Sequence, residues 1–313
     1  MPELRHDPLT DTSVIIAPER AARPRTATIV ADETGRPVPD CPFCPGNEAQ
    51  TPPEVTRTGV GNPDTPGWRV RVFPNKYPIV GGANGGAGAT GAHEVVVLSP
   101  AHDVSFALLT LEQAVEVLGV LQDRAVAHLE AGRAFVQVLV NHGAAAGASL
   151  AHPHAQLLAL DFVPPAVDDA VARLDDAGVD LVAAAIAQAG DLAVITGAAT
   201  AWCPHASGAP YTVRIAHRST RARFEEATDA ELHVVAAATR EALGRLSGVL
   251  GDVPYNLVIH TAPPGRAGNF HWYVEVTPRV GTVAGFEMGT GILVNTVAPE
   301  TAAAMLRKVE VAS

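Results

Sequence analysis

Hydrophobic residues recur with helical spacing in two long stretches of the chain. The first stretch runs from residue 111 to about residue 129, and the sequence Thr110-Leu111-Glu112-Gln113 that opens it has the spacing of a capping box. The second stretch runs to about residue 246 and is opened in the same way by Thr228-Asp229-Ala230-Glu231. The pattern therefore predicts two helices of similar length.

Each predicted helix has the same neighbours along the chain. A strand is predicted after each one, at 135–140 in the first case and at 255–259 in the second. Each strand leads to a histidine, and these two residues, His142 and His260, are 118 positions apart. We interpret this correspondence as an internal duplication. We therefore expect an α+β fold of two fused units, each with an antiparallel sheet and one long helix.

The two units are expected at residues 1–165 and 166–313. They are not equivalent, because the second unit has Tyr273 where the first has His154, and Thr220 where the first has His102. Only the first unit therefore keeps a full set of reactive side chains.

The composition is that of a globular protein with an excess of acidic groups. The 313 residues are 47% hydrophobic, which is enough for a substantial core, and 33 acidic against 22 basic residues give a formal net charge of -11. That charge disfavours a broad surface for nucleic acid or for an anionic membrane, so we expect neither partner. No apolar run reaches membrane-spanning length and residues 1–7 lack the features of a signal peptide, so we expect a cytoplasmic location.

Alternate polar residues mark one strand of the first unit. His152, His154 and Gln156 would share one face of an extended strand, and the loop before them, residues 141–151, contains Ser149 among glycines and alanines. Small residues in that loop would let backbone N–H groups approach an anion closely. Two imidazoles, an amide and a phosphate-sized hollow indicate phosphorus chemistry. An H-x-H pair alone occurs about as often on the solvated face of an edge strand.

The sequence Cys41-Pro42-Phe43-Cys44 is a C-x-x-C knuckle of the kind that binds zinc. Two neutral histidines could complete the site, and we expect these to be His102, which follows a strand predicted at 94–98, and His152. A closed Cys2His2 set has no open position for water, so we predict a structural role for the zinc. One alternative is a pair of reduced, unliganded cysteines. A thiol redox pair is less favoured, because no thioredoxin-like βαβ pattern surrounds it.

Six further histidines are interpreted as surface or loop residues without a role: His6, His93, His128, His205, His217 and His233.

Taken in order along the chain, these and other segments resemble the galactose-1-phosphate uridylyltransferase family of the histidine-triad superfamily. The resemblance covers nearly the whole length, and the number and order of the matching segments make it specific. The matching segments are Asp7-Pro8-Leu9-Thr10, Ala17-Pro18-Glu19-Arg20-Ala21-Ala22-Arg23-Pro24, the Cys41/Cys44 knuckle, Arg71-Val72-Phe73-Pro74-Asn75-Lys76-Tyr77-Pro78, Ser99-Pro100-Ala101-His102, His152-Pro153-His154-Ala155-Gln156 and Gly285-Phe286-Glu287-Met288.

The resemblance implies a catalytic mechanism. His154 would attack the α-phosphorus of a nucleotide sugar and carry the nucleotidyl group as a covalent phosphoramidate, and Gln156 would donate to a phosphoryl oxygen where charge accumulates. A backbone carbonyl near Pro153 would accept a hydrogen bond from the other ring nitrogen of His154. A sugar 1-phosphate would be the second substrate. The family also implies a homodimer with the active site near the interface.

The resemblance further implies which residues bind the substrate. Arg20 and Arg23 would reach the diphosphate, although both could equally belong to a solvated turn. Phe73, Asn75 and Asn141 would line the nucleotide pocket, and Ser149 would hold the phosphates together with the loop amides. Phe286 and Glu287 would lie at the hexose end, with Glu287 accepting hydrogen bonds from sugar hydroxyls.

Three departures from the family pattern narrow what the resemblance implies. Ala170 and Tyr273 stand where some members place a glutamate and a histidine that bind a second metal, so we predict no second metal. Gly281 stands where some members have a lysine near the sugar phosphate, which weakens the case for galactose 1-phosphate. The run 282–291 resembles relatives that use other nucleotide sugars, including the ADP-glucose phosphorylases.

The main hypothesis is therefore a nucleotidyltransferase that works by a ping-pong mechanism, UDP-glucose:hexose-1-phosphate uridylyltransferase. The first alternative keeps the covalent intermediate but uses inorganic phosphate as the acceptor, which would make the protein a phosphorylase of nucleotide sugars. A zinc-stabilised nucleotide-binding protein without turnover is an alternative from another class, and the intact pair of His154 and Gln156 argues against it. A zinc hydrolase is disfavoured, because all four metal ligands are assigned and no H-E-x-x-H helix is present.

Overall fold

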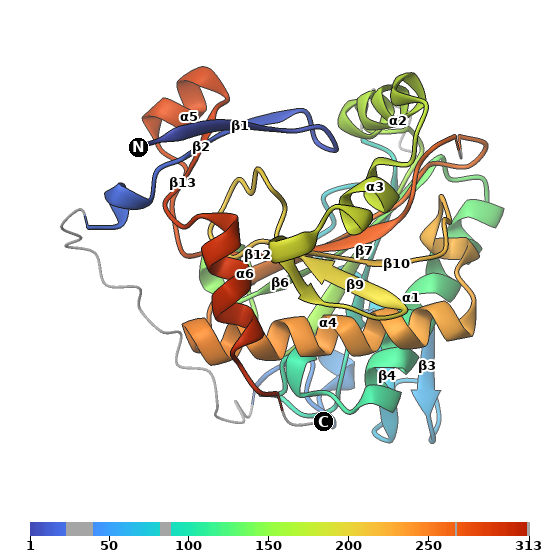
Figure 1. Ribbon diagram of the computed structural model, residues 1–313. Coiled ribbons are helices and arrows are strands. Elements are labelled where there is room, and N and C mark those ends of the chain that lie inside the picture. Colours follow the sequence, from blue (N-terminus) through green and yellow to red (C-terminus); the bar gives the residue numbers. More distant parts are fainter. Residues whose placement is uncertain (23–39, 82–88, 267, 312–313) are drawn as a thin grey trace.

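The computed structural model describes residues 1–22, 40–81, 89–266 and 268–311 (Figure 1). The strands are β1 (Glu3–Asp7), β2 (Thr12–Ile16), β3 (Thr56–Gly59), β4 (Trp68–Pro74), β5 (Gly91–Val97), β6 (Phe135–His142), β7 (His154–Leu160), β8 (Ala193–Ile195), β9 (Ala199–Trp202), β10 (Val213–His217), β11 (Tyr255–His260), β12 (Tyr273–Pro278) and β13 (Leu293–Asn295). The α-helices are α1 (Leu111–Glu130), α2 (Pro165–Ala177), α3 (Leu181–Ala187), α4 (Asp229–Leu250), α5 (Gly285–Thr290) and α6 (Pro299–Arg307).

One antiparallel sheet runs through both halves of the chain. Among the described residues it has ten strands, in the order β3-β4-β5-β7-β6-β11-β12-β10-β9-β8. The order β4-β5-β7-β6 of the first half is mirrored by β9-β10-β12-β11 in the second, as the duplication predicted. The prediction of an α+β fold of two fused units, each with an antiparallel sheet and one long helix, is confirmed, and the structure shows that the strands of the two units join in one continuous sheet. Strands β6 and β11 pair with each other, with Asn141 opposite Asn256, so neither half leaves an open edge there.

Both long helices begin at the predicted threonines. The Thr110 side chain accepts a hydrogen bond from the Gln113 N–H, at 3.2 Å. At the second helix the capping box is complete, because the Glu231 carboxylate also accepts from the Thr228 N–H, at 2.7 Å. Helix α4 continues one turn beyond the predicted end and stops at Gly251, whose φ of 76° is readily adopted only without a side chain.

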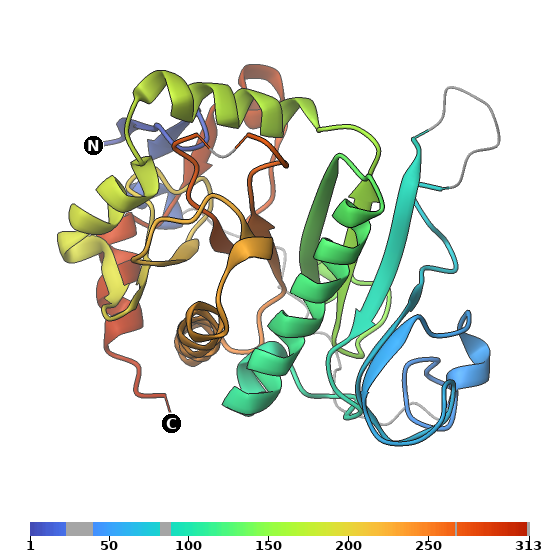
Figure 2. The ribbon, with the colours of Figure 1, turned by 90° about the vertical axis from the view of Figure 1, so that its right-hand side faces the viewer.

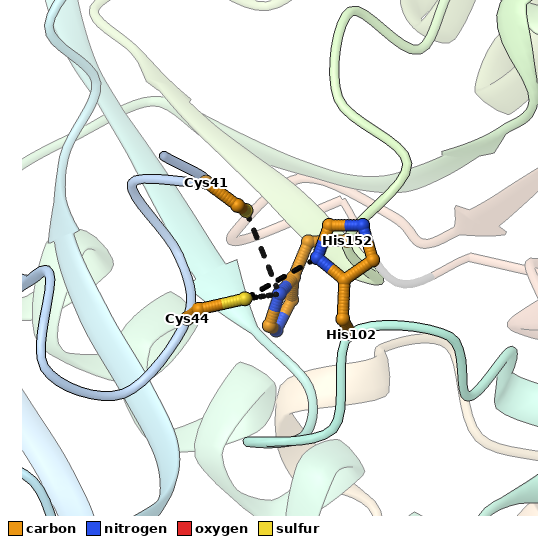
Figure 3. A group of neighbouring side chains, drawn as sticks. All are labelled: Cys41, Cys44, His102 and His152. Atoms are coloured by element: carbon orange, nitrogen blue, oxygen red, sulfur yellow. Dashed lines mark hydrogen bonds between the residues drawn. The ribbon is translucent and has the colours of Figure 1, made fainter. Parts of the chain in front are cut away.

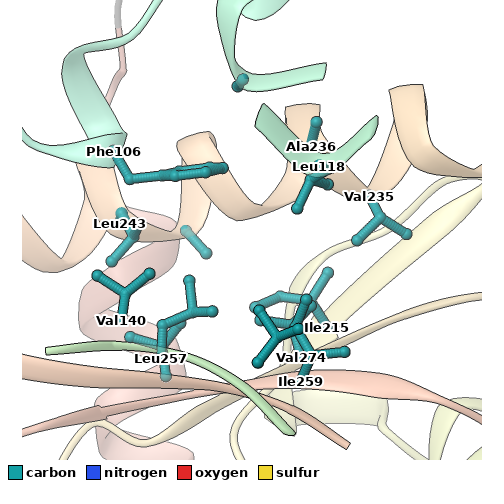
Figure 4. Close-up of a cluster of buried hydrophobic side chains, with 14 of the residues drawn as sticks. Phe106, Leu118, Val140, Ile215, Val235, Ala236, Leu243, Leu257, Ile259 and Val274 are labelled. Atoms are coloured by element: carbon teal, nitrogen blue, oxygen red, sulfur yellow. The ribbon is translucent and has the colours of Figure 1, made fainter. Parts of the chain in front are cut away.

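Helices α1 and α4 pack against one face of the sheet, and the main hydrophobic core lies beneath them (Figures 2 and 4). Leu118 of α1, Leu243 of α4, Val140 of β6 and Leu257 of β11 all belong to this core. Burying a side chain of this size contributes about 1.5–3 kcal/mol to folding. The cluster contains residues from both halves, so the two units share one core.

The opposite face of the sheet is covered differently in the two halves: in the first half the knuckle packs on it, with Cys41 and Phe43 against Phe73, Val95 and Val97. In the second half, helices α2 and α3 pack over Trp202 and Tyr273, together with Leu9 from the hairpin of β1 and β2. Strand β13 pairs in parallel with β2, so the hairpin lies among C-terminal elements (Figure 1). The corresponding face of the first half carries the candidate site. The predicted boundary after residue 165 falls at the start of α2 and stays a prediction. No helix of the described part of the chain is long and apolar enough to cross a membrane.

A buried ion network fastens the N-terminal hairpin to the second half. The Arg214 guanidinium donates to Asp7 at 2.6 Å and to Glu275 at 2.7 Å, and Arg214 and Asp7 are both buried. Burial raises the pKa of Asp7, but Arg214 and hydrogen bonds from the Leu9 N–H and the Thr10 hydroxyl outweigh it. The pKa of Asp7 therefore ends below its ordinary value of 3.8.

We predict that Asp7→Asn lowers the free energy of unfolding at pH 7 by about 3 kcal/mol, because it leaves the buried Arg214 with one carboxylate. The folded-state pKa of Asp7 is depressed, so its stabilising effect is complete above pH 3.8 and is lost as the pH falls through the folded value. Urea unfolding at several pH values should therefore show the two proteins converging in acid. Asp11→Asn, an exposed change in the same hairpin, should cost less than about 0.5 kcal/mol. A difference that persists unchanged at pH 3 would contradict the assignment.

Candidate functional site

Four side chains from three separate segments converge beside the start of β7 (Figure 3). They are Cys41, Cys44, His102 and His152, and their ligand atoms all lie within 4.8 Å of one another. The knuckle is shaped by its own backbone, since the Cys44 N–H donates to the Cys41 carbonyl at 3.1 Å. The four residues predicted from the sequence to bind one metal therefore do come together.

The His152 ring is held at both nitrogens. Its Nε2 lies 2.8 Å from the carbonyl oxygen of Ser99, which can only accept, so Nε2 carries the ring proton. Nδ1 therefore presents its lone pair to the two sulfurs, 3.5 Å from Cys44 and 3.8 Å from Cys41. Burial, chiefly, lowers the pKa of His152 to about 4, which keeps the ring neutral near pH 7. A neutral ring whose second nitrogen is anchored to a carbonyl is the usual form of a metal-binding histidine.

The thiols need a cation to ionise in this place. Burial and the neighbouring Cys41 raise the pKa of Cys44 to about 11. A bound divalent cation would reverse that effect, because it favours the thiolate. The cluster could therefore hold one metal ion.

His154 is the first residue of β7, directly after the cluster. Its Nδ1 lies 2.8 Å from the backbone oxygen of His152, so Nδ1 carries the proton and Nε2 keeps a lone pair. This carbonyl is the partner that the sequence predicted near Pro153. The prediction that His152 lies in the same strand is wrong, because β7 begins at His154 and the chain bends at His152. The bend allows the His152 ring to reach Ser99 and the cysteines.

His154 lies at the wall of a pocket of about 650 Å³. Burial lowers the pKa of His154, so its ring is neutral near pH 7. The Phe43 ring, from the knuckle, packs edge-on against His154 at 5.3 Å between ring centroids. The pocket is lined by apolar side chains, amides, hydroxyls and one cation. Among the lining residues are the apolar Phe43, Phe73, Val95 and Leu150, the amides Gln50, Asn75 and Gln156, the hydroxyl residues Thr51, Tyr77 and Ser149, and Lys76.

The structure brings five of the predicted catalytic and substrate-binding residues together in this pocket: His154, Gln156, Phe73, Asn75 and Ser149. Asn141 lies outside the lining and stabilises the neighbouring loop, since Asn256 donates to its Oδ1 at 2.7 Å and to the Ala146 carbonyl at 2.9 Å. Gly143, with φ of 78°, packs so closely on Pro254 that a Cβ would lie 2.9 Å from it.

The remaining predicted residues that the structure describes do not line the pocket. Arg20 is exposed on the short 3-10 helix Pro18–Ala22, and Arg23 lies outside the described residues. Phe286 is exposed on α5, and the Glu287 carboxylate accepts from the Ala284 N–H at the start of the same helix, at 3.1 Å. Their predicted roles at the diphosphate and the hexose stay predictions.

Two histidines were misjudged as surface or loop residues. His93 is buried in β5, and its Nε2 lies 2.9 Å from Oε1 of Gln156. His128 is half-buried in α1, with Nε2 3.1 Å from a Glu94 carboxylate oxygen. Strand β5 begins at Gly91, three residues before the predicted start. If the predicted strand had been extended back to Gly91, the alternation of side chains between its two faces would have placed His93 on the same face as Val95 and Val97.

The second half contains a counterpart of the cluster without its cysteines. His271 Nε2 lies 2.8 Å from the carbonyl oxygen of His217, which is 118 positions after Ser99. His271 Nδ1 faces a carboxylate oxygen of Asp180 at 2.9 Å, and Thr220, the counterpart of His102, donates to the same oxygen at 3.1 Å. Burial raises the pKa of Asp180, but these hydrogen bonds and the one from Ala183 N–H leave it below its ordinary value. A carboxylate therefore stands where the first half presents sulfur.

The repeated strand order, the two long helices and the H-x-H-x-Q segment with its two buried histidines define a protein of the histidine-triad superfamily. A family model described as a domain of unknown function (DUF4921) matches residues 98–311. ADP-glucose phosphorylase of Arabidopsis thaliana is 30% identical, over 98% of this chain and 93% of that protein. Galactose-1-phosphate uridylyltransferase of Haemophilus influenzae is 28% identical, over 88% of this chain and 82% of that protein.

Solved structures agree with the sequence comparisons. The crystal structure of the Arabidopsis thaliana ADP-glucose phosphorylase with bound ADP-glucose superposes with a TM-score of 0.86, at 28% identity and covering 100% of both chains. A uridylyltransferase structure superposes with a TM-score of 0.75, at 27% identity over 98% of both chains. The chain belongs to the galactose-1-phosphate uridylyltransferase family.

We predict one tightly bound metal ion per chain, which Cys44→Ala should remove. Elemental analysis of the purified protein would measure the stoichiometry. A metal that binds only the folded state stabilises it by about 4 kcal/mol when free metal exceeds its dissociation constant a thousand-fold, so a chelator should lower the melting temperature of the wild type but not of the variant. Cys203→Ala, at a buried thiol in the second half, should keep the metal. Retention of a full equivalent by Cys44→Ala would contradict the assignment.

Proposed function

We propose that this protein is an enzyme that transfers a nucleotidyl group from a nucleotide sugar through a covalent intermediate on His154. The observation that carries the proposal is the orientation of the His154 ring. Nδ1 is occupied by the His152 carbonyl, so the lone pair of Nε2 is free in a ring that burial keeps neutral. A non-catalytic binding protein has no need of such an oriented, uncharged nucleophile.

The proposed reaction has two steps. In the first, Nε2 of His154 attacks the α-phosphorus of the nucleotide sugar, an N–P bond forms, and the P–O bond to the β-phosphate breaks to release sugar 1-phosphate. In the second, an oxygen of the acceptor attacks the same phosphorus and the N–P bond breaks. The His152 carbonyl stabilises the positive charge that the ring carries between the two steps.

The pocket supports the same reaction through its hydrogen-bond donors. The amide of Gln156 is two residues along the strand from His154 and would donate to a non-bridging phosphoryl oxygen, where negative charge grows during transfer. Lys76 and Ser149, at the same pocket, would bind the phosphates. Phe43 and Phe73, whose ring centroids are 5.4 Å apart, offer an apolar surface for the nucleobase.

We propose inorganic phosphate as the acceptor, with ADP-glucose as the donor, in place of the uridylyltransferase hypothesis. The full-length similarity to the Arabidopsis thaliana phosphorylase supports this choice, as do Gly281 and the run 282–291. The products would be ADP and glucose 1-phosphate. Uridylyl transfer to a hexose 1-phosphate remains the second candidate, supported by the similarity to the Haemophilus influenzae protein.

We propose that the metal of the Cys2His2 cluster is zinc and that its role is structural. Tetrahedral zinc with ordinary bond lengths places sulfur and nitrogen ligands about 3.5 Å apart. The sulfur–nitrogen distances of 3.3, 3.5 and 3.8 Å in the cluster fit that requirement. When bound, the metal would fix the knuckle against His152 and keep the thiols deprotonated. The homodimer and the cytoplasmic location stay predictions.

We expect ADP-glucose labelled in its α-phosphate to leave one equivalent of label on the denatured wild-type protein, and none on His154→Ala. The alanine variant should keep its metal and its melting temperature to within a few degrees, because the change opens onto the pocket. His142→Ala, at the far end of the same loop, should label like the wild type. Normal labelling of His154→Ala would remove the proposed nucleophile.

We expect the purified enzyme to convert ADP-glucose and phosphate to ADP and glucose 1-phosphate, at least about ten-fold faster than it converts UDP-glucose and galactose 1-phosphate. The measurement is a panel of both nucleotide sugars against phosphate, glucose 1-phosphate and galactose 1-phosphate, with kcat/KM for each pair. Both donors would react by the same two steps, through an adenylyl group on His154 from ADP-glucose and a uridylyl group from UDP-glucose, so the panel tests the choice of base and acceptor alone. Preference for galactose 1-phosphate would favour the second candidate.

A further inference from the structure

His93 lies next to the proposed reaction centre but does not line the pocket. It is 5% exposed in β5, the strand that pairs with β7. Val95 is opposite Gln156 in this pairing, and Val97 is opposite His154, so His93 shares their face of the sheet. Its Nε2 lies 2.9 Å from Oε1 of Gln156.

The position of the ring proton on His93 follows from a backbone group. The N–H of Ile79 donates to Nδ1 of His93, at 3.3 Å. A backbone N–H can only donate, whereas a side-chain amide can be turned over to present its oxygen instead. Nδ1 of His93 must therefore accept and hold a lone pair. Burial lowers the pKa of His93 below 6.5, and the hydrogen bond with Gln156, which acts in the opposite direction, only partly offsets this effect. The ring is therefore neutral near pH 7 and carries a proton on one nitrogen only. That proton is on Nε2 and is donated to Gln156.

Asn75 is a second amide beside Nε2 of His93. Its Oδ1 accepts a hydrogen bond from the Tyr77 N–H at 2.8 Å, which fixes the orientation of its amide. Its Nδ2 consequently lies beside Nε2 of His93, at 3.2 Å. Both nitrogens are donors, so the hydrogens of Nδ2 are directed elsewhere. Asn75 and Gln156 both line the pocket, so two amide NH2 groups are available there.

We propose that His93 is a positioning residue, which occupies Oε1 of Gln156 and so turns the NH2 group of that amide toward the phosphoryl group on His154. The proposal rests on the proposed function. An unrestrained glutamine amide has two nearly equivalent orientations, and the wrong one would present its oxygen to a phosphoryl anion. Neutral histidine can prevent this, because one nitrogen accepts from Ile79 while the other donates to Gln156.

The tautomer can be measured without any turnover. In protein labelled with nitrogen-15, long-range proton–nitrogen correlation of the imidazoles, assigned by comparison with His93→Leu, should show His93 as the neutral Nε2–H tautomer at pH 7.5. A proton on Nδ1, or a ring protonated on both nitrogens, would overturn the proposal. Because no substrate is present, this result is independent of the proposed function.

The effect on catalysis is measured in a single turnover, with α-labelled ADP-glucose or UDP-glucose, whichever labels the wild type. His93→Leu should slow formation of the labelled histidine by about ten-fold, the expected effect of a misoriented hydrogen-bond donor, while the Kd of the nucleotide sugar changes by less than about two-fold. His128→Leu removes an imidazole that contacts Glu94, the neighbour of His93 on the other face of β5. It should leave the labelling rate unchanged.

A double-mutant cycle separates positioning from general damage to the fold. If His93 acts through Gln156, His93→Leu should have almost no further effect once Gln156→Leu is present. Effects that multiply would show that His93 acts otherwise and would overturn the proposal. Absence of labelling in the wild type with either nucleotide sugar would instead count against the proposed function, and the tautomer measurement would still decide on His93.

Discussion

The hydrogen bond between Nδ1 of His154 and the backbone oxygen of His152 is the interaction on which the candidate site depends. It selects the tautomer of the proposed nucleophile, and it is only as rigid as the peptide that carries the oxygen. That peptide belongs to a residue whose side chain is held at both ends, by the Ser99 carbonyl and by the cysteine cluster. A metal bound there would therefore orient the nucleophile through the main chain, without touching the substrate. This arrangement explains how a closed Cys2His2 set can matter for chemistry that takes place at another residue.

The second half has a counterpart of this arrangement in which the reactive groups are replaced. His271 keeps the hydrogen bond from its Nε2 to a backbone carbonyl, but Asp180 stands in the place of the cysteines. Tyr273 takes the position of His154, and Glu275, the counterpart of Gln156, pairs with the buried Arg214. Helices α2 and α3 and the N-terminal hairpin cover this face. A polar strand face must either be paired internally or remain open to a ligand, since a buried polar group without a partner is costly. The first half keeps a pocket over part of this face, and the second half pairs the polar groups of its face internally.

The parts of the fold that local sequence determines were predictable. Threonine caps and helical spacing located α1 and α4, because these signals are contained in a short segment of sequence. The pattern of cysteines and histidines located the metal cluster, because few residue types bind zinc. The pairing of β6 with β11, which joins the two units in one sheet, was not predicted, because it leaves no local mark in the sequence. His93 was missed for a similar reason: the contact with Gln156 arises from the pairing of β5 with β7, which are separated in sequence by α1 and β6. Phe286 was assigned to the site by resemblance alone, and the single chain places it on an exposed helix elsewhere.

A diphosphate, the ligand of the proposed function, would meet an electrostatic difficulty here, since the formal net charge of -11 repels an anion at long range. At physiological ionic strength this repulsion is screened beyond about 8 Å, so the balance is decided by groups in direct contact. Of the described side chains that line the pocket, Lys76 is the one cation, and the other donors are neutral amides and hydroxyls. Neutral donors stabilise a transferring phosphoryl group only where they are aimed correctly, because they lack the range of a full charge. The orientation of each amide is then as important as its presence. Two backbone N–H groups set these orientations. The Tyr77 N–H fixes the amide of Asn75 directly. The Ile79 N–H fixes the tautomer of His93, which in turn faces the amide of Gln156.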